Sequence, residues 1–202
     1  MTNTTDPARH REKMIRKAAA REKIMATKQA EKGLIIVNTG KGKGKSTAGF
    51  GMALRALGHG MNVAVIQFIK GSREIGEKKA LAAFGAQARF FACGEGFTWE
   101  TQDKARDEAL AARTWAEAAK ALSDPDIALV MLDELNIVLR YGYLPLDAVL
   151  KALAARPAGQ HVVITGRNAP RELIEAADLV TEMTLVKHPF RSGVKAQAGV
   201  EY

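Results

Sequence analysis

The most informative segment of this 202-residue chain is Thr39-Gly40-Lys41-Gly42-Lys43-Gly44-Lys45-Ser46-Thr47. It follows an apolar run, residues 34–37, and precedes a segment with helical spacing. The alternating glycines let backbone N–H groups converge on an anion, and the helix opening near Lys45 adds the positive end of its dipole. Lys45 is placed to reach terminal phosphates, and the Ser46 hydroxyl to reach a divalent metal ion. The motif is a phosphate-binding P-loop in which Thr39 stands where the first glycine is usual, with Gly40 one position later.

Length and composition indicate one globular domain with a proper core, since 47% of the residues are hydrophobic and 26% charged. No apolar stretch is long enough to span a bilayer, and the N-terminus lacks the apolar core of a signal peptide. We therefore expect no membrane partner and a cytoplasmic location. The single cysteine, Cys93, excludes an intrachain disulfide and is interpreted as a partly buried thiol rather than a metal ligand.

The net charge of +8 is concentrated at the N-terminus, because residues 1–32 hold nine Lys or Arg against four Asp or Glu. The remainder is nearly balanced, which argues against a nucleic-acid partner. Residues 1–32 are predicted to form a basic helix or tail, with Asp6 as cap, Pro7 in the first turn and Gly33 as the stop. This segment is a candidate cap for an active site in the domain formed by residues 33–202.

After Gly33 the sequence alternates between strand and helix patterns. The predicted strands are near-continuous apolar runs at residues 34–38, 63–68, 89–92, 127–132, 162–165 and 179–185. This alternation predicts an α/β fold, an open and mainly parallel sheet with helices on both faces, as in P-loop NTPases of the RecA-like type. Ligands bind such sheets at the carboxyl ends of the strands.

Helices are predicted between these strands at residues 47–57, 101–122, 145–155 and 171–177. The second of them carries alanines at spacings of four and three, which predicts one small-residue face for close packing. These alanines are Ala105, Ala109, Ala112, Ala116 and Ala119.

Two further motifs carry chemistry. The strand at 127–132 runs directly into Asp133 and Glu134, the place where P-loop proteins hold Mg²⁺ and where a Glu can activate water. The segment at 93–101 places Phe97 and Trp99 beside glycines, where they form either a hydrophobic plug or a surface for a flat, apolar ligand. At the C-terminus, His188 is either a metal ligand or a hydrogen-bonded structural residue in a frayed end.

Several segments resemble the corrinoid adenosyltransferases of the P-loop type in order and spacing, from about Gly33 to Tyr202. They are TGKGKGKSTAGFG, RALGHG, GFTWET, LDEL, YGYLPL, VVITGR and the C-terminal VKHPF and GVKAQ. GFTWET and the C-terminal motifs are more specific than the P-loop. The departures are Lys41, where relatives often have Asn, Ser46, where they often have Thr, and residues 1–32, which match least.

The resemblance implies transfer of the 5′-deoxyadenosyl group of ATP to Co(I) of a corrinoid, either cob(I)yrinic acid a,c-diamide or cob(I)alamin, with release of triphosphate. Reduced cobalt is then the nucleophile at C5′, and ATP lies reversed in the P-loop relative to typical NTPases. The implied ATP-binding residues are Thr39, Gly40, Lys41, Gly42, Lys43, Gly44, Lys45, Ser46, Thr47 and Arg55.

The resemblance also implies that Ser46 and Glu134 hold Mg²⁺ or Mn²⁺, and that Glu134, Phe97 and Trp99 are catalytic. The two aromatic residues match a pair that crowds the lower face of the corrin and displaces its axial base, so that Co(II) is more easily reduced by a flavin or flavodoxin-type donor. A homodimer is implied as well.

Two other functions fit the P-loop and the Asp133-Glu134 pair by themselves. One is a RecA-like, nucleic-acid-dependent ATPase, which the basic tail favours. The other is a nucleotide-binding regulatory or chaperone module without turnover. The nearly balanced charge of residues 33–202 and the GFTWET segment favour the adenosyltransferase.

Overall fold

The computed structural model describes residues 6–69, 75–93 and 103–202. The chain divides into two compact units, Met1–Lys32 and Gly33–Tyr202. In the first unit, α1 (Pro7–Ala26) is capped by Asp6, whose side chain accepts a hydrogen bond from the Ala8 amide at 3.1 Å. None of the residues of α1 is buried.

The N-terminal helix ends earlier than predicted. It stops at Ala26, with Thr27 as its C-cap, rather than continuing to Lys32. The Thr27 hydroxyl donates to the carbonyl of Ile24 at 2.7 Å, and the Lys28 amide donates to Met25. Because no apolar face of α1 is buried, only weak local propensity supports its last turns, and these local bonds end the helix.

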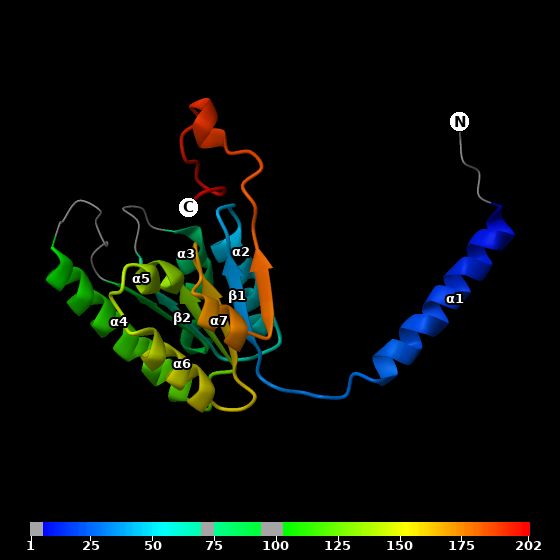
Figure 1. The fold of residues 1–202 in the computed structure, drawn as a ribbon, viewed down its shortest axis with the longest axis horizontal. Helices are drawn as coiled ribbons and strands as arrows, with labels where there is room; N and C mark the ends of the chain where they lie inside the picture. The colour runs from blue at the N-terminus through cyan, green and yellow to red at the C-terminus, as the bar shows by residue number, and fades with distance from the viewer. Residues whose placement is uncertain (1–5, 70–74, 94–102) are drawn as a thin grey trace. The chain divides into compact units, whose positions relative to one another are not determined.

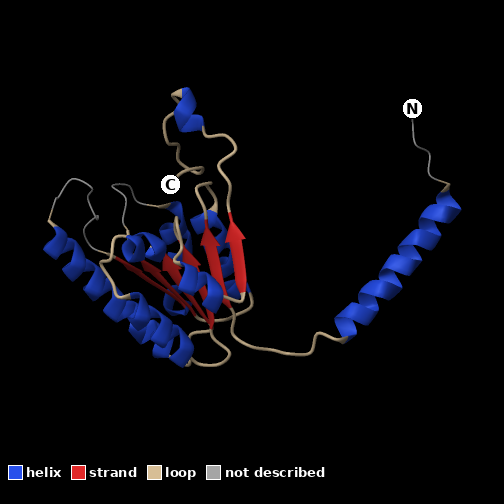
Figure 2. Cartoon of the chain, in the orientation of Figure 1, coloured by secondary structure: helices blue, strands red, loops and turns tan. Residues whose placement is uncertain are grey.

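The second unit is built on six parallel strands in the order β3-β2-β4-β5-β1-β6 (Figures 1 and 2). Their bounds are β1 (Ile35–Thr39), β2 (Val63–Gln67), β3 (Ala88–Ala92), β4 (Leu129–Asp133), β5 (His161–Thr165) and β6 (Leu179–Glu182). The predicted parallel sheet and all six of its strands are confirmed. The helices of this unit are α2 (Lys45–Gly58), α3 (Gly76–Ala82), α4 (Lys104–Ser123), α5 (Leu135–Arg140), α6 (Leu146–Ala155) and α7 (Arg171–Ala176).

Alternate residues of the central strands enter two separate cores, one on each face of the sheet. Val37, Ile66 and Leu132 pack with α4, α5, α6 and α7, whereas Ile36 and Val65 pack with α2 and α3. Successive side chains of a strand point to opposite faces, so both faces of the sheet must be covered. The predicted helices on both faces are therefore confirmed.

The predicted small-residue face of α4 is wrong. Ala105, Ala109, Ala112 and Ala116 are exposed, and Ala119 is only partly buried. The buried residues of α4 are Asp107, Ala111, Thr114, Ala118, Ala121 and Leu122. Asp107 and Thr114 break the apolar pattern of this face, but the structure supplies their partners. Thr114 donates to the Leu110 carbonyl at 2.9 Å, and Asp107 is hydrogen-bonded to the Tyr143 hydroxyl.

The last strand, β6, ends at Glu182, three residues before its predicted end. Met183 leaves the sheet and lies over the loop that follows β1. Its amide donates to the Thr39 carbonyl at 2.8 Å, and its carbonyl accepts from the Gly42 amide at 2.7 Å. The carboxyl ends of β2, β4, β5 and β1 therefore meet on one side of the sheet, next to this loop.

Candidate active site

The P-loop connects β1 to α2 as the sequence predicts. Thr39 is still the last residue of β1, and the first left-handed backbone position is Gly40, with φ of 95°. A Cβ atom on Gly40 would lie 2.5 Å from the Met183 carbonyl oxygen, so no other residue fits there without a shift of the backbone. The shift of the first glycine from position 39 to position 40 therefore has a physical reason: the left-handed backbone position is at 40. The chain needs no glycine at 39, where the Thr39 hydroxyl instead accepts a hydrogen bond from the Ala169 amide at 3.1 Å.

Lys45 opens α2 and is buried, with 7% of its surface exposed. Its ammonium donates to the Gly42 carbonyl, which folds the side chain back over the P-loop. Burial lowers the pKa of Lys45, the nearby carboxylate of Glu134 opposes this shift, and the cations Arg167 and Lys43 reinforce it. A buried ammonium among other cations is poised to bind an anion of high charge.

Asp133 and Glu134 follow β4, and the structure separates their roles. Both carboxylate oxygens of Asp133 are occupied. Oδ1 accepts from the Thr165 hydroxyl at 2.8 Å, and Oδ2 accepts from the Gln67 amide group at 3.1 Å. These partners are fixed by the sheet, because Gln67 is paired with Asp133 across β2 and β4 and Thr165 ends the other neighbouring strand, β5. Both oxygens of Asp133 are therefore tied to neighbouring strands of the sheet.

Glu134, in contrast, has one carboxylate oxygen that accepts no hydrogen bond from the described residues. This atom, Oε2, is buried. The backbone of Glu134 is left-handed, with φ of 59°, which is uncommon for a residue with a side chain, and its amide donates to the Thr165 hydroxyl at 2.9 Å. Burial, reinforced by the negative charge of Asp133, raises the pKa of Glu134 to about 7, against the pull of Lys45 and Arg167.

Gly166 and Asn136 close the site beside Glu134. Gly166 has φ of 125°, and a Cβ atom there would lie 2.9 Å from Asn136 Cβ and 3.2 Å from Glu134 Oε2. The Asn136 side-chain nitrogen donates to the Gly166 carbonyl at 3.0 Å, while its oxygen is buried without a partner in the described structure. Two buried polar oxygens without hydrogen-bond partners among the described residues, Glu134 Oε2 and Asn136 Oδ1, thus belong to residues that directly follow β4.

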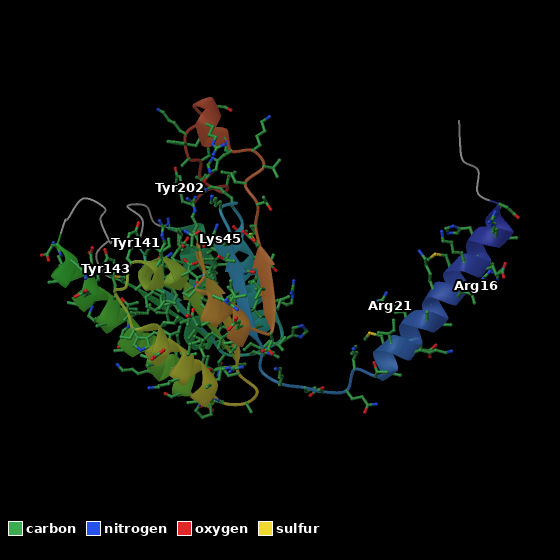
Figure 3. All side chains as sticks on the ribbon, viewed as in Figure 1. Arg16, Arg21, Lys45, Tyr141, Tyr143 and Tyr202 are labelled. Atoms are coloured by element: carbon green, nitrogen blue, oxygen red, sulfur yellow. The ribbon has the colours of Figure 1, made fainter. Side chains whose placement is uncertain are left out.

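The structure brings most of the predicted ATP-binding residues together. Lys41, Lys43, Gly44 and Thr47 are exposed around the buried Lys45, and Ser46 is partly buried in the first turn of α2. Figure 3 shows the Lys45 side chain at the end of the sheet where β1 and β6 terminate.

Arg55 is not brought to the P-loop. It is exposed in the last turn of α2, ten residues from Lys45, or about 15 Å along the helix axis. The structure therefore places Arg55 at the end of α2 that is remote from the P-loop.

Phe97 and Trp99 lie outside the described residues. Cys93, just before them, is a completely buried thiol.

His188 caps a short 3₁₀ helix (Pro189–Ser192), where its Nδ1 accepts a hydrogen bond from the Phe190 amide at 3.2 Å. This agrees with the interpretation of His188 as a hydrogen-bonded structural residue. Within the described ranges no group of three or more His, Cys, Asp or Glu side chains is arranged to hold a metal, and no helix is long and apolar enough to cross a membrane.

Sequence reasoning assigned no role to Gln67, Thr165, Gly166 or Arg167. VVITGR contains three of them, but only the order of the strands shows that β5 lies between β1 and β4. A polar residue at the carboxyl end of an apolar strand is the one local signal for such positions, and it is a weak one.

The fold and the site define a P-loop protein that binds a nucleoside triphosphate. A solved structure of the flagellar accessory protein FlaH from Methanocaldococcus jannaschii is similar, with a TM-score of 0.50 and 11% identity over 74% of this chain and 70% of that one, which supports the fold alone.

The family model "ATP:corrinoid adenosyltransferase BtuR/CobO/CobP" matches residues 31–202. A corrinoid adenosyltransferase of Sinorhizobium sp. is 59% identical over 98% of this chain and 93% of its own length. One from Pseudomonas aeruginosa is 56% identical over 96% of each chain, and CobA from Salmonella typhimurium is 49% identical over 88% of this chain and 90% of its own. The chain therefore belongs to the ATP:corrinoid adenosyltransferase family, and it is an enzyme whose co-substrate is ATP and whose acceptor is a corrinoid.

Proposed function

We propose that the P-loop of this enzyme holds a leaving group, the triphosphate of ATP, while Co(I) of the corrinoid attacks the ribose C5′. Cobalt donates an electron pair to form the Co–C bond, and the pair of the breaking C5′–O bond leaves with inorganic triphosphate. The observation that carries the proposal is the buried Lys45 in the P-loop beside the unpaired carboxylate oxygen of Glu134.

The reaction needs no side-chain base, because the nucleophile is the reduced metal of the substrate. What the protein must supply is position and charge: the negative charge of the leaving triphosphate has to be neutralised as the C5′–O bond breaks. Lys41, Lys43 and Lys45, together with the loop amides, supply this charge. The carbon that is attacked lies outside the P-loop in this arrangement, which is compatible with an ATP molecule reversed relative to typical NTPases.

A divalent cation, Mg²⁺ or Mn²⁺, fits beside the triphosphate. Such hard cations prefer oxygen ligands and usually combine one or two carboxylates with phosphate oxygens and water. Glu134 offers its unpaired Oε2 atom and Ser46 its hydroxyl, whereas both oxygens of Asp133 are already hydrogen-bonded. When bound, the cation supplies positive charge to the triphosphate. The residues of this chain that hold it are then Ser46 and Glu134.

The corrin side of the proposal rests on the resemblance of GFTWET. Phe97 and Trp99 crowd the lower face of the corrin, remove its axial base, and so favour reduction of Co(II) by a flavin or flavodoxin-type donor. The acceptor is cob(I)yrinic acid a,c-diamide or cob(I)alamin. The buried, unbridged Cys93 is compatible with the reducing cytoplasm that such chemistry requires. A homodimer is proposed from the same family.

The deciding experiment mixes the protein, ATP, Mg²⁺ and chemically reduced corrinoid and follows Co–C bond formation by absorbance. We expect adenosylated corrinoid and triphosphate in equal amounts, and no triphosphate without corrinoid. Release of orthophosphate that is stimulated by DNA or RNA, with no Co–C bond, would instead identify a nucleic-acid-dependent ATPase.

A further inference from the structure

Residues 197–202 form a turn that reaches back to the P-loop. The Glu201 amide donates to the Gln197 carbonyl at 2.8 Å, and the Gly199 amide donates to the carbonyl of Tyr202 at 2.8 Å. Gly199 adopts the left-handed conformation, with φ of 78°, that such a turn requires. The C-terminus consequently lies close to the loop between β1 and α2 (Figures 1 and 3).

This turn places a carboxylate on a P-loop lysine. The Glu201 carboxylate accepts a hydrogen bond from the Lys43 ammonium and forms an ion pair with it. The Glu201 side chain is only 15% exposed, whereas the segment before the turn is largely open to solvent, with Val186 92% and Phe190 78% exposed. The contact is therefore a local feature of the terminal turn.

The position of Glu201 has a chemical consequence. Lys43 belongs to a loop that carries three lysines, and Arg167 adds a fourth positive charge that acts on Lys45. A carboxylate and a phosphate oxygen are equivalent partners for an ammonium group, each accepting a charge-assisted hydrogen bond. Glu201 and a triphosphate therefore compete for the same cation.

We propose that Glu201 is a positioning residue that holds Lys43 in the nucleotide-free enzyme and gives it up to the triphosphate when ATP binds. The terminal turn then leaves the P-loop, and its return after adenosyl transfer favours release of the triphosphate product. This inference rests on the proposal that the P-loop holds the triphosphate.

The expected change in affinity for triphosphate follows from the solvent exposure of the Lys43–Glu201 ion pair. The Lys43 side chain is 52% exposed, and partly solvated ion pairs change an equilibrium constant by a factor of about two to five. Glu201→Gln keeps the shape of the side chain and the backbone bonds of the turn but removes the charge. We expect the full-length variant to bind inorganic tripolyphosphate about two- to fivefold more tightly than the wild-type protein.

A double-mutant cycle separates this pairing from a general effect of charge. In a Lys43→Gln background, Glu201→Gln should leave the affinity for tripolyphosphate unchanged. Glu172→Gln, an exposed acid at the start of α7, is the matched control and should also have no effect. Unchanged or weaker binding by Glu201→Gln would overturn the inference, and so would an equal gain in the Lys43→Gln background.

A second measurement tests whether the C-terminal turn leaves the P-loop when the anion binds. Hydrogen exchange of the Glu201 amide should become faster when tripolyphosphate is added, because its bond to Gln197 opens. Unchanged exchange at saturating tripolyphosphate would contradict release of the turn. Lys45→Ala tests the underlying assignment: if it abolishes binding of tripolyphosphate while Glu201→Gln has no effect, the P-loop proposal stands and only the role of Glu201 fails.

Discussion

Replacing Glu134 by Gln should make the nucleotide-free protein more stable at alkaline pH while it abolishes adenosyl transfer. The folded protein buries this carboxyl group next to Asp133, which raises its pKa from 4.5 to about 7. Between these values the folded protein keeps a proton that the unfolded chain has released. The free energy of unfolding therefore falls as the pH rises from about 4.5 to about 7, and above pH 7 the full penalty is present. Gln cannot ionise and escapes this penalty.

The magnitude follows from the change in pKa. Each pKa unit corresponds to about 1.4 kcal/mol, so the limiting penalty is about 3 kcal/mol above pH 7. Lys45 loses an attracting carboxylate in the variant, which offsets part of the gain. We therefore expect Glu134→Gln to raise the free energy of unfolding by about 2 kcal/mol at pH 8 and by less than about 1 kcal/mol at pH 5.

The assay is urea denaturation of both proteins at pH 5 and pH 8 without nucleotide, combined with the Co–C absorbance assay. Asp133→Asn is the matched control, because it makes the same chemical change at the neighbouring carboxylate. In Asp133→Asn, an NH₂ group, which donates, takes the place of one carboxylate oxygen that accepts a hydrogen bond from Thr165 or Gln67. This substitution should lower the free energy of unfolding by about 1–3 kcal/mol. A stability change in Glu134→Gln that is the same at both pH values would refute the reasoning.

Three further predictions concern the other parts of the site. Gly166→Ala should lower the free energy of unfolding by about 2–4 kcal/mol in urea denaturation, whereas Gly142→Ala, also left-handed but in open space, should lower it by about 1 kcal/mol. Lys45→Ala should weaken ATP binding in equilibrium dialysis by about 10- to 100-fold while retaining the folded circular dichroism spectrum. Trp99→Ala should reduce turnover of Co(II) corrinoid with a flavin reductant much more than turnover of pre-reduced Co(I), and equal losses would contradict the axial-base role.

Much of the fold was predictable because its signals are local. Apolar runs of strand length alternate with helical patterns, and this pattern indicates a parallel sheet covered on both faces. The boundaries of strands and helices follow the predictions closely, except for the early ends of α1 and β6. β6 ends early because β1 ends at Thr39 and the Met183 carbonyl accepts a hydrogen bond from Gly42 of the P-loop instead. The short α3 and α5 were missed, since six or seven residues are too few to show a helical period, and neither follows a proline as the equally short α7 does.

The alanine face of α4 shows why pattern alone misleads within an element. Two sets of residues in α4 are spaced so that each lies along one face of the helix. One set consists of alanines, and the other contains Asp107 and Thr114. The second is buried, because the hydroxyl of Tyr143 and the carbonyl of Leu110 satisfy its polar groups. Nothing within α4 specifies those partners, so the sequence favoured the wrong face.

The α/β class, the P-loop motif and the acidic pair after β4 were all predictable from local sequence patterns. This is so because strand periodicity, glycine spacing and the start of a helix are properties of neighbouring residues. Three features became visible only in the folded chain: Asp133 is hydrogen-bonded to Gln67 and Thr165, Glu134 keeps an oxygen without a partner among the described residues, and Glu201 pairs with Lys43. These contacts join residues 32 to 158 positions apart. They depend on the order in which the strands are assembled and on where the C-terminus turns back, which no local pattern records.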